Sequence, residues 1–448
     1  MSLRAIGTTI SSRTGLLLAG LIAFSLAGLA RSASASTLCV NTDGKHGCIS
    51  SINAAISAAS PGDVIQVWPG VYREQVIINK SLSLIAVSPL DAIIDAANLA
   101  NGIWVNGMST APNPGVANVV ISGFKVRNAN FEGILLTNGT NITVVDNEVA
   151  DNDASLGSGT CPGQPAFETN EGDDCGEGIH LMGVDHSTIL RNEVAHNAGG
   201  ILTSDETGPS AHNLISENYV HDNSYDCGIT LASHAPATTV IPTAKLSFGV
   251  WYNTISRNVS LRNGTVTPGA GVGIFAPSPG TTDTGNVVIN NDLISNGATG
   301  VAMHNHAAPP SPAPPVNMND NVIVGNHFAG NGPDNPGAPT SGPTGINVFS
   351  MGMLTGTVIS QNTFDSEAID IGFSTPTGQL NVHFNNFSSG IGIDNLSTGT
   401  VDATENWWNC ATGPNGKRCA TIQGAGVSFT PWLSSPYRDD SDDQHGRD

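Results

Sequence analysis

Apolar and polar residues alternate with a period of two between Gly176 and His234, and Gly, Asn and Asp interrupt the alternation every few residues. GIHLMG, GILTSD and GITLAS are three copies of one segment, and STILRNEVAHN and NLISENYVHDN are two copies of another. A period of two predicts β-strands. Each unit is too thin to bury its own apolar side, so we predict that the units stack as a β-solenoid.

Copies of the first segment recur from Gly102 to Gly390, and copies of the second carry Asn residues five positions apart. Asn tolerates left-handed turns and can hydrogen-bond the same residue one coil away, so columns of Asn are expected at the turns. The Asn pairs are 147/152, 192/197, 218/223, 258/263, 291/296 and 326/331. The first segments predict one internal aliphatic stack of Ile179, Ile201, Ile229, Ile274, Val301 and Ile346.

One amphipathic helix is expected, at residues 50–59, with Ser50 or Ser51 as N-cap and Pro61-Gly62 as the stop. Strands are predicted at Val64–Val67, at Val76–Ile78 and over 82–87. A short helix before such strands would cap the open end of the solenoid and hide backbone groups that otherwise recruit another chain.

The chain divides into four predicted parts. Residues 1–35 have a positive start, an apolar run and an Ala-Ser-Ala site, which is typical of a signal peptide, with an uncleaved anchor as the alternative. Residues 36–100 form the cap and first coils, 101–436 the β-helix with loop insertions, and 437–448 a charged disordered tail. The signal peptide predicts a secreted or periplasmic protein, and no later segment is apolar enough to span a membrane. We expect a monomer.

The formal net charge of −21 excludes most nucleic-acid binders, whose partners require a basic surface. It also disfavours a polyanionic polysaccharide unless a bound cation bridges the two. With only 5% aromatic residues and 52 glycines, the composition is rich in turns and poor in helix formers.

Seven cysteines in an exported chain predict local disulfides. Three pairs bracket short loops and one cysteine, Cys227, is left over, either as an idle thiol or as a partner of Cys161 or Cys175. The predicted pairs are Cys39–Cys48, Cys161–Cys175 and Cys410–Cys419.

Two stretches carry a resemblance to known proteins. The helix followed by SPGDVIQVWPGVYREQVIINKSLSLI resembles the start of pectin-lyase-like proteins, and ENWWNCATGPNG with GVSFTPWL resembles the closing coil of NosD-like bacterial repeat proteins. The resemblance spans roughly residues 37–437 and implies an all-β, right-handed parallel β-helix. That fold hosts lyases, hydrolases, epimerases, adhesins and binding proteins, so it does not decide the function.

The alternation places one set of side chains on an outer face of the predicted helix. Loop insertions leave and enter at both ends of these strands, which predicts a trough with loop walls. The outer set is His180, Met182, Leu202, Ser204, Thr230, Ala232, Phe275, Ala302 and His304.

Ionisable residues gather on both sides of this trough. The predicted catalytic set is Glu177, His180, Asp205, Asp226 and His234, and the predicted substrate-binding set is Asp173, Asp174, Met182, Thr230 and Phe275. Asp205 and His234 follow equivalent strands of successive coils, which places them roughly 5–6 Å apart. Asp173-Asp174 resembles the Asp-Asp dyad of polygalacturonase-type hydrolases, although that family's surrounding motifs are absent.

Three functions remain open. Two carboxylates could hydrolyse a glycosidic bond, with Asp226 or Glu177 as the acid, Asp205 as the base and no required cofactor. Alternatively, the acids could hold Ca²⁺ while His180 or His234 abstracts a proton, as in a polysaccharide lyase or C5-epimerase. The third is a non-catalytic surface or glycan-binding protein, or a NosD-like metal-handling protein with His304 and His306 as ligands. Glycoside hydrolysis is favoured.

Overall fold

A computed structural model describes residues 35–108, 115–153, 176–234, 248–277, 280–305, 316–334, 340–375, 378–387 and 390–438. Met1–Ala35 and Ser36–Asp448 are separate units. The predicted signal peptide lies almost wholly outside the described residues, as does most of the predicted tail. In the described ranges, no helix is long and apolar enough to cross a membrane.

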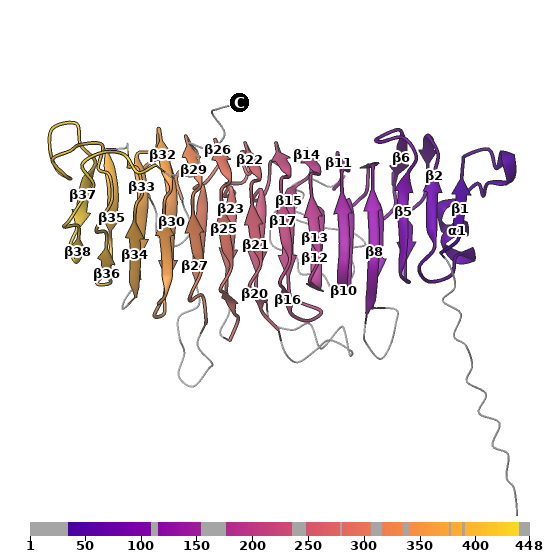
Figure 1. The fold of residues 1–448 in the computed structure, drawn as a ribbon, viewed down its shortest axis with the longest axis horizontal. Helices are drawn as coiled ribbons and strands as arrows, with labels where there is room; N and C mark the ends of the chain where they lie inside the picture. The colour runs from indigo at the N-terminus through magenta and orange to yellow at the C-terminus, as the bar shows by residue number, and fades with distance from the viewer. Residues whose placement is uncertain are drawn as a thin grey trace, which may run out of the picture. The chain divides into compact units, whose positions relative to one another are not determined.

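The second unit is a solenoid of stacked parallel strands (Figure 1). Most coils contribute a strand to each of three faces. The site face contains β4 (Val76–Ile78), β7 (Ile103–Asn106), the first half of β10 (Ile134–Val145), β12 (Glu177–Asp185), β15 (Gly199–Ser204), β19 (Ile229–Ala232), β23 (Val272–Phe275), β27 (Val301–Asn305), β30 (Thr344–Ser350), β33 (Ile369–Ser374), β35 (Ile391–Asn395) and β37 (Thr421–Gly424).

The second face continues the same sheet around a bend made by β10 and β12. It contains β1 (Thr37–Val40), β2 (Val64–Val67), β5 (Leu82–Ala86), β8 (Val116–Ser122), β13 (Thr188–Leu190), β17 (Leu214–Ser216), β21 (Thr254–Ser256), β25 (Val287–Ile289), β28 (Val322–Val324), β31 (Thr357–Ser360), β34 (Gln379–His383), β36 (Thr400–Asp402) and β38 (Val427–Ser428). Short strands at the bend are β16 (Ser210–Ala211), β20 (Val250–Trp251) and β24 (Asp283–Thr284).

The third face is a separate sheet of ten strands. It contains β3 (Gly70–Tyr72), β6 (Ala92–Asp95), β9 (Phe124–Arg127), β11 (Glu148–Ala150), β14 (Glu193–Ala195), β18 (Tyr219–His221), β22 (Val259–Leu261), β26 (Asp292–Ile294), β29 (His327–Ala329) and β32 (Thr363–Asp365).

The core is a column of aliphatic residues inside the coils. The predicted stack is confirmed except at one coil, where Val272 and not Ile274 lies opposite Ile229. Ile274 pairs instead with Leu231 and Met303, one inward position further along. In AGVGIF the prediction aligned Gly273 with Gly228, whereas the structure places Gly271 there. The two alignments differ by two residues, so the same side chains point inward and Ile274 is still buried.

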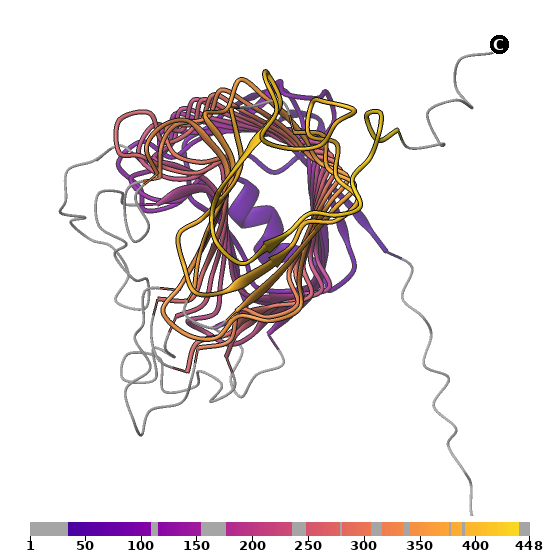
Figure 2. The ribbon, with the colours of Figure 1, turned by 90° about the vertical axis from the view of Figure 1, so that its left-hand side faces the viewer.

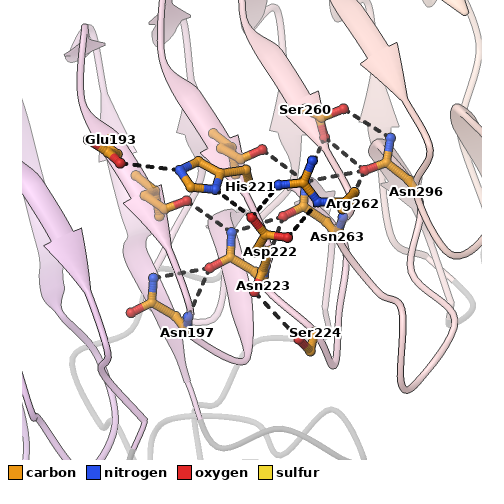
Figure 3. Close-up of polar contacts among 12 residues, drawn as sticks. Glu193, Asn197, His221, Asp222, Asn223, Ser224, Ser260, Arg262, Asn263 and Asn296 are labelled. Carbon is orange, nitrogen blue, oxygen red and sulfur yellow. Dashed lines mark hydrogen bonds and ion pairs between the residues drawn. The ribbon is translucent and has the colours of Figure 1, made fainter. Parts of the chain in front are cut away.

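Two Asn columns run along the inside of the turns, as predicted. In each, the side-chain oxygen of one Asn accepts hydrogen bonds from the backbone N–H and the side-chain amide of the equivalent Asn in the preceding coil, as Figure 3 shows for Asn197, Asn223, Asn263 and Asn296. The other column runs from Asn147 to Asn406. A third column from Asn213 to Asn321, not predicted, continues from Ser187.

The left-handed conformation falls on the residue before each column Asn and not on the Asn itself. Arg191, Glu217 and Asp222, which precede column Asn residues, have φ values of 51°, 57° and 57°. This corrects the prediction that Asn takes the strained turn. The column Asn is buried and satisfies the turn backbone, whereas Arg191 and Glu217, each directly before a column Asn, are exposed.

The N-terminal end is covered by the helix α1 (Ile52–Ala58), which lies across the opening when viewed along the coils (Figure 2). A 3-10 turn, η1 (Lys45–Gly47), precedes it. Ser51 caps α1 by accepting a hydrogen bond from the backbone of Ala54, and Ile52, Ala55 and Ile56 are buried. Two predicted disulfides are present, Cys39–Cys48 near this end and Cys410–Cys419 in the last coils.

One carboxylate ends an Asn column. Glu367 takes the place of the next Asn after Asn331, and its Oε1 accepts from the Asn331 backbone and side-chain amides at 3.1 and 2.9 Å. Its Oε2 has no hydrogen-bond partner among the described residues. Burial outweighs these hydrogen bonds and raises the pKa of Glu367 from 4.5 to about 7.

Replacing Ile201 with Asp should unfold the solenoid. Ile201 is buried between Ile179 and Ile229, and an unpaired buried charge costs several kcal/mol, on the order of the whole stability of a domain. Thermal unfolding followed by far-UV circular dichroism measures this. Val266→Asp is the matched control, since Val266 is 64% exposed; equal stability of the two variants would contradict the internal stack.

Glu367→Gln should stabilise the protein at pH 8 and leave it nearly unchanged at pH 4. Because the folded pKa is raised, the folded state binds the proton more tightly, and stability falls as pH rises from about 4.5 to 7. The glutamine keeps an acceptor without the charge, so we expect a gain on the order of 1–3 kcal/mol. Denaturant unfolding at both pH values tests this, with the more exposed Glu217→Gln as control.

Candidate active site

The predicted outer face is confirmed on β12, β15, β19, β23 and β27. His180 lies beside Leu202, which lies beside Thr230, while Met182, Ser204, Ala232, Phe275 and His304 form the adjacent column. Most of these side chains are buried, with His180 only 4% exposed. The face therefore holds its polar groups in a desolvated environment, where electrostatic interactions are stronger than in water.

His180 is the centre of the first polar group. Its Nδ1 lies 3.0 Å from Glu132 Oε1 and 3.7 Å from Glu177 Oε2, and its Nε2 lies 2.8 Å from Ser204 Oγ. Glu132 Oε2 in turn accepts a 2.7 Å hydrogen bond from the backbone N–H of Glu177. The imidazole is thus oriented at both nitrogens, and the Glu132 carboxylate is held by hydrogen bonds at both oxygens.

Gly199 separates two of the predicted catalytic carboxylates. It lies opposite Glu177 in the next coil. A Cβ on Gly199 would lie 2.9 Å from Cγ of Glu177 and 3.5 Å from Oδ2 of Asp226. Glu177 and Asp226 therefore approach the same point on the outer face from its two sides. Glu177 is buried, and Asp226 is partly exposed.

A second polar group follows the ends of β15 and β19. The Ser204 hydroxyl donates to Glu206 Oε2, and Glu206 Oε1 lies 3.3 Å from His234 Nδ1. Asp205 accepts from the backbone N–H of His234 at 2.6 Å and from the Ser233 hydroxyl at 2.8 Å. Asp205 and His234 are therefore in contact, as their spacing predicted, and Ser204 joins this group to His180.

Burial dominates the electrostatics of this second group. It raises the pKa of Asp205 from 3.8 to about 7, with the neighbouring Glu206 adding to the shift and His234 opposing it. Burial also raises the pKa of Asp283 well above its usual range, with Asp205 as the second cause.

Three of the predicted substrate-binding side chains are shielded from solvent to a large extent. Met182 and Thr230 are buried, and Phe275 packs on Cys227, Ala270 and Ala302. Cys227 is a buried free thiol, and burial raises its pKa. Binding roles for Met182, Thr230 and Phe275 stay predictions.

His304 lies apart from the two polar groups. Its Nε2 is 2.8 Å from Asp334 Oδ2, and its ring lies between Phe275 and Phe349. Its predicted partner His306 lies outside the described residues, as do Asp173, Asp174, Cys161 and Cys175. The third disulfide and the Asp-Asp dyad therefore stay predictions.

Glu132 was missing from the predicted site. The sequence does contain a pattern that could have identified it: Glu-Gly-Ile occurs both at Glu132 and at Glu177, where two equivalent strands begin. Two sets can offer three metal-ligand atoms within 4.8 Å of one another: Glu132, Glu177 and His180, and Asp205, Glu206 and His234. The predicted Ca²⁺ stays a prediction; each of these sets includes an imidazole, whereas Ca²⁺ prefers oxygen ligands.

A comparison with known protein families supports the β-helix fold. A family model described as a right handed beta helix region matches residues 98–244. The chain folds as a right-handed parallel β-helix. This confirms the predicted fold, while the NosD-like branch stays a prediction. No curated protein matches the sequence.

Several solved structures are similar to this β-helix. The catalytic domain of an α-1,3-glucanase, solved with tetrasaccharides, is 11% identical, has a TM-score of 0.52, and the match covers 88% of this chain and 68% of that chain. The A-module of a mannuronan C-5 epimerase from Azotobacter vinelandii is 13% identical, with a TM-score of 0.48 and coverages of 85% and 94%. A pectate lyase is 13% identical, with a TM-score of 0.46 and coverages of 91% and 83%. At these identities the likeness concerns the fold alone.

Proposed function

We propose that this protein is a secreted glycoside hydrolase that cleaves a polysaccharide on the outer face of β12, β15 and β19. The observation that carries the proposal is the approach of Glu177 and Asp226 to the same point above Gly199. Glycosidic bonds are cleaved by two carboxyl groups that flank the bond, one as acid and one as base or nucleophile. The fold agrees with this role, since the α-1,3-glucanase domain shares it, but fold alone does not decide the reaction.

The surroundings of the two carboxyls suggest their roles. Glu177 is buried beside Glu132 and His180, and we assign it the role of the acid that protonates the leaving oxygen. Asp226 is more exposed and suits the carboxylate that activates water or attacks the sugar. His180 acts as a positioning residue, because its Nδ1 and Nε2 hold Glu132 and Ser204.

The alternative functions predict different results with the same substrates. A lyase with His180 as base would form an unsaturated uronate that absorbs ultraviolet light, and an epimerase would change the sugar without cutting the chain. A non-catalytic protein would bind a glycan and release nothing. Reducing-end formation without ultraviolet absorbance is the result that supports hydrolysis.

Glu177→Gln and Asp226→Asn should each lower hydrolysis by at least about 100-fold with little change in melting temperature, because each removes a proton donor or acceptor but keeps the shape. The assay is reducing-end release by the mature protein on a panel of neutral and acidic polysaccharides. Asp146→Asn, which alters an exposed ion pair with Arg191, is the control and should keep full activity. Full activity in both folded site variants would place the chemistry elsewhere.

Gly199→Ala should lower turnover about 10- to 100-fold without unfolding the protein. Its backbone conformation accepts Ala, but the new Cβ would meet Cγ of Glu177 at 2.9 Å and push that flexible side chain aside. Gly390→Ala is the matched control, because a Cβ there meets nothing within 4 Å. Circular dichroism and kcat measured on both variants test this, and unchanged kcat for Gly199→Ala would argue against catalysis at this point.

A further inference from the structure

Asp205, Glu206 and His234 form a compact set of ligand-type atoms that the proposed hydrolysis does not use. They follow the ends of β15 and β19, and one atom from each lies within 4.8 Å of the others. Asp205 and Glu206 are fully buried, and the His234 side chain is 13% exposed. Buried carboxylates in such a set require a compensating positive charge.

The spacing of these atoms fits a small divalent ion. Tetrahedral ligands about 2.0–2.1 Å from a zinc ion lie roughly 3.3–3.4 Å from one another. His234 Nδ1 and Glu206 Oε1 are 3.3 Å apart. Imidazole and carboxylate groups are both ligands that Zn²⁺ and similar transition metals accept, whereas Ca²⁺ selects oxygen ligands.

Asp283 supplies a second, independent observation beside this set. It is fully buried, and its Oδ2 has no hydrogen-bond partner among the described residues, while Oδ1 accepts from Asn286 at 2.5 Å. Asp283 lies beside this set, because the backbone N–H of its neighbour Thr282 donates to the Ser233 hydroxyl, which donates to Asp205. Asp205 and His234 both act on it electrostatically.

Ion pairs join Lys45, Lys125, Arg127, Arg191, Arg257 and Arg262 to acids outside this set. The other possible ligand set is less suited to an ion, since both ring nitrogens of His180 already make hydrogen bonds.

We propose that Asp205, Glu206 and His234 bind one divalent transition-metal ion, with Zn²⁺ as the best-fitting member of the class. Asp283 contributes negative charge beside the site. The ion would fasten the turn after β15 to the end of β19 and, through Ser204, fix the Nε2 side of His180. The site stands independently of the proposed hydrolysis, whose carboxyls are Glu177 and Asp226.

Isothermal titration of the tag-free mature protein, stripped with EDTA and titrated with ZnCl₂, tests the site. We expect one ion per chain and a melting temperature that rises with added ZnCl₂, because an ion that binds only the folded state stabilises it. CaCl₂ should bind more weakly. No saturable Zn²⁺ binding would overturn the proposal and leave His234 and Glu206 as an ion pair alone.

Variants locate the ion without an activity assay. His234→Ala and Glu206→Gln should each weaken Zn²⁺ binding by about 100-fold or more, since each removes a direct ligand. His327→Ala is the matched control, because His327 is an exposed histidine between Asp292 and Asp365 and should leave binding unchanged. Loss of binding in His304→Ala, with binding intact in His234→Ala, would overturn the proposal and place the ion at His304 and Asp334.

Discussion

The hydrogen bonds between successive coils are the interaction on which the other features of this protein depend. Parallel strands place equivalent residues about 4.8 Å apart along the axis. Side-chain amides such as those of Asn192, Asn218 and Asn258 then satisfy the turn backbone of the neighbouring coil. Because a buried, unsatisfied amide costs about 1–3 kcal/mol, the columns hold every coil in one register. A single register is what allows a side chain in one coil to meet a chosen side chain in the next.

The candidate site uses this register directly. Glu132 and Glu177 precede equivalent strands, and the next coil has Gly199 at the same position, which leaves room for the Glu177 and Asp226 side chains to approach one point. One coil carries His180 and the next Ser204, so the two polar groups of the face are joined by a 2.8 Å contact. A site on stacked strands is more rigid than one on loops, which suits chemistry that requires carboxyl groups at a fixed separation.

The same part of the molecule holds charges that a purely structural solenoid has little reason to bury. Burial raises the pKa of Asp205 and of Asp283, so both oppose folding when they are ionised. Clusters of buried groups with shifted pKa values are typical of functional sites, and the rest of the fold offsets the destabilisation that they cause. In this chain, long aliphatic stacks and Asn columns on both sides of the site provide that stability.

The sequence by itself determined the solenoid, the outward position of His180 and Ser204, the internal stack and the Asn columns, because a period of two and a repeat of fixed content depend only on local geometry. It also brought Asp205 and His234 together, since equal offsets in successive coils become neighbours. It placed Ile274 one inward position away from its true partner, because AGVGIF offers two alignments of the same parity and only hydrogen bonding with the adjacent coils selects between them. Tertiary structure alone decided that Glu132 reaches His180 from the preceding coil, that Gly199 opens the space between Glu177 and Asp226, and that Asp283 lies beside Asp205. The Glu132–His180 contact, for example, joins residues 48 positions apart, and loops of unequal length between the coils hide that spacing from any pattern in the chain.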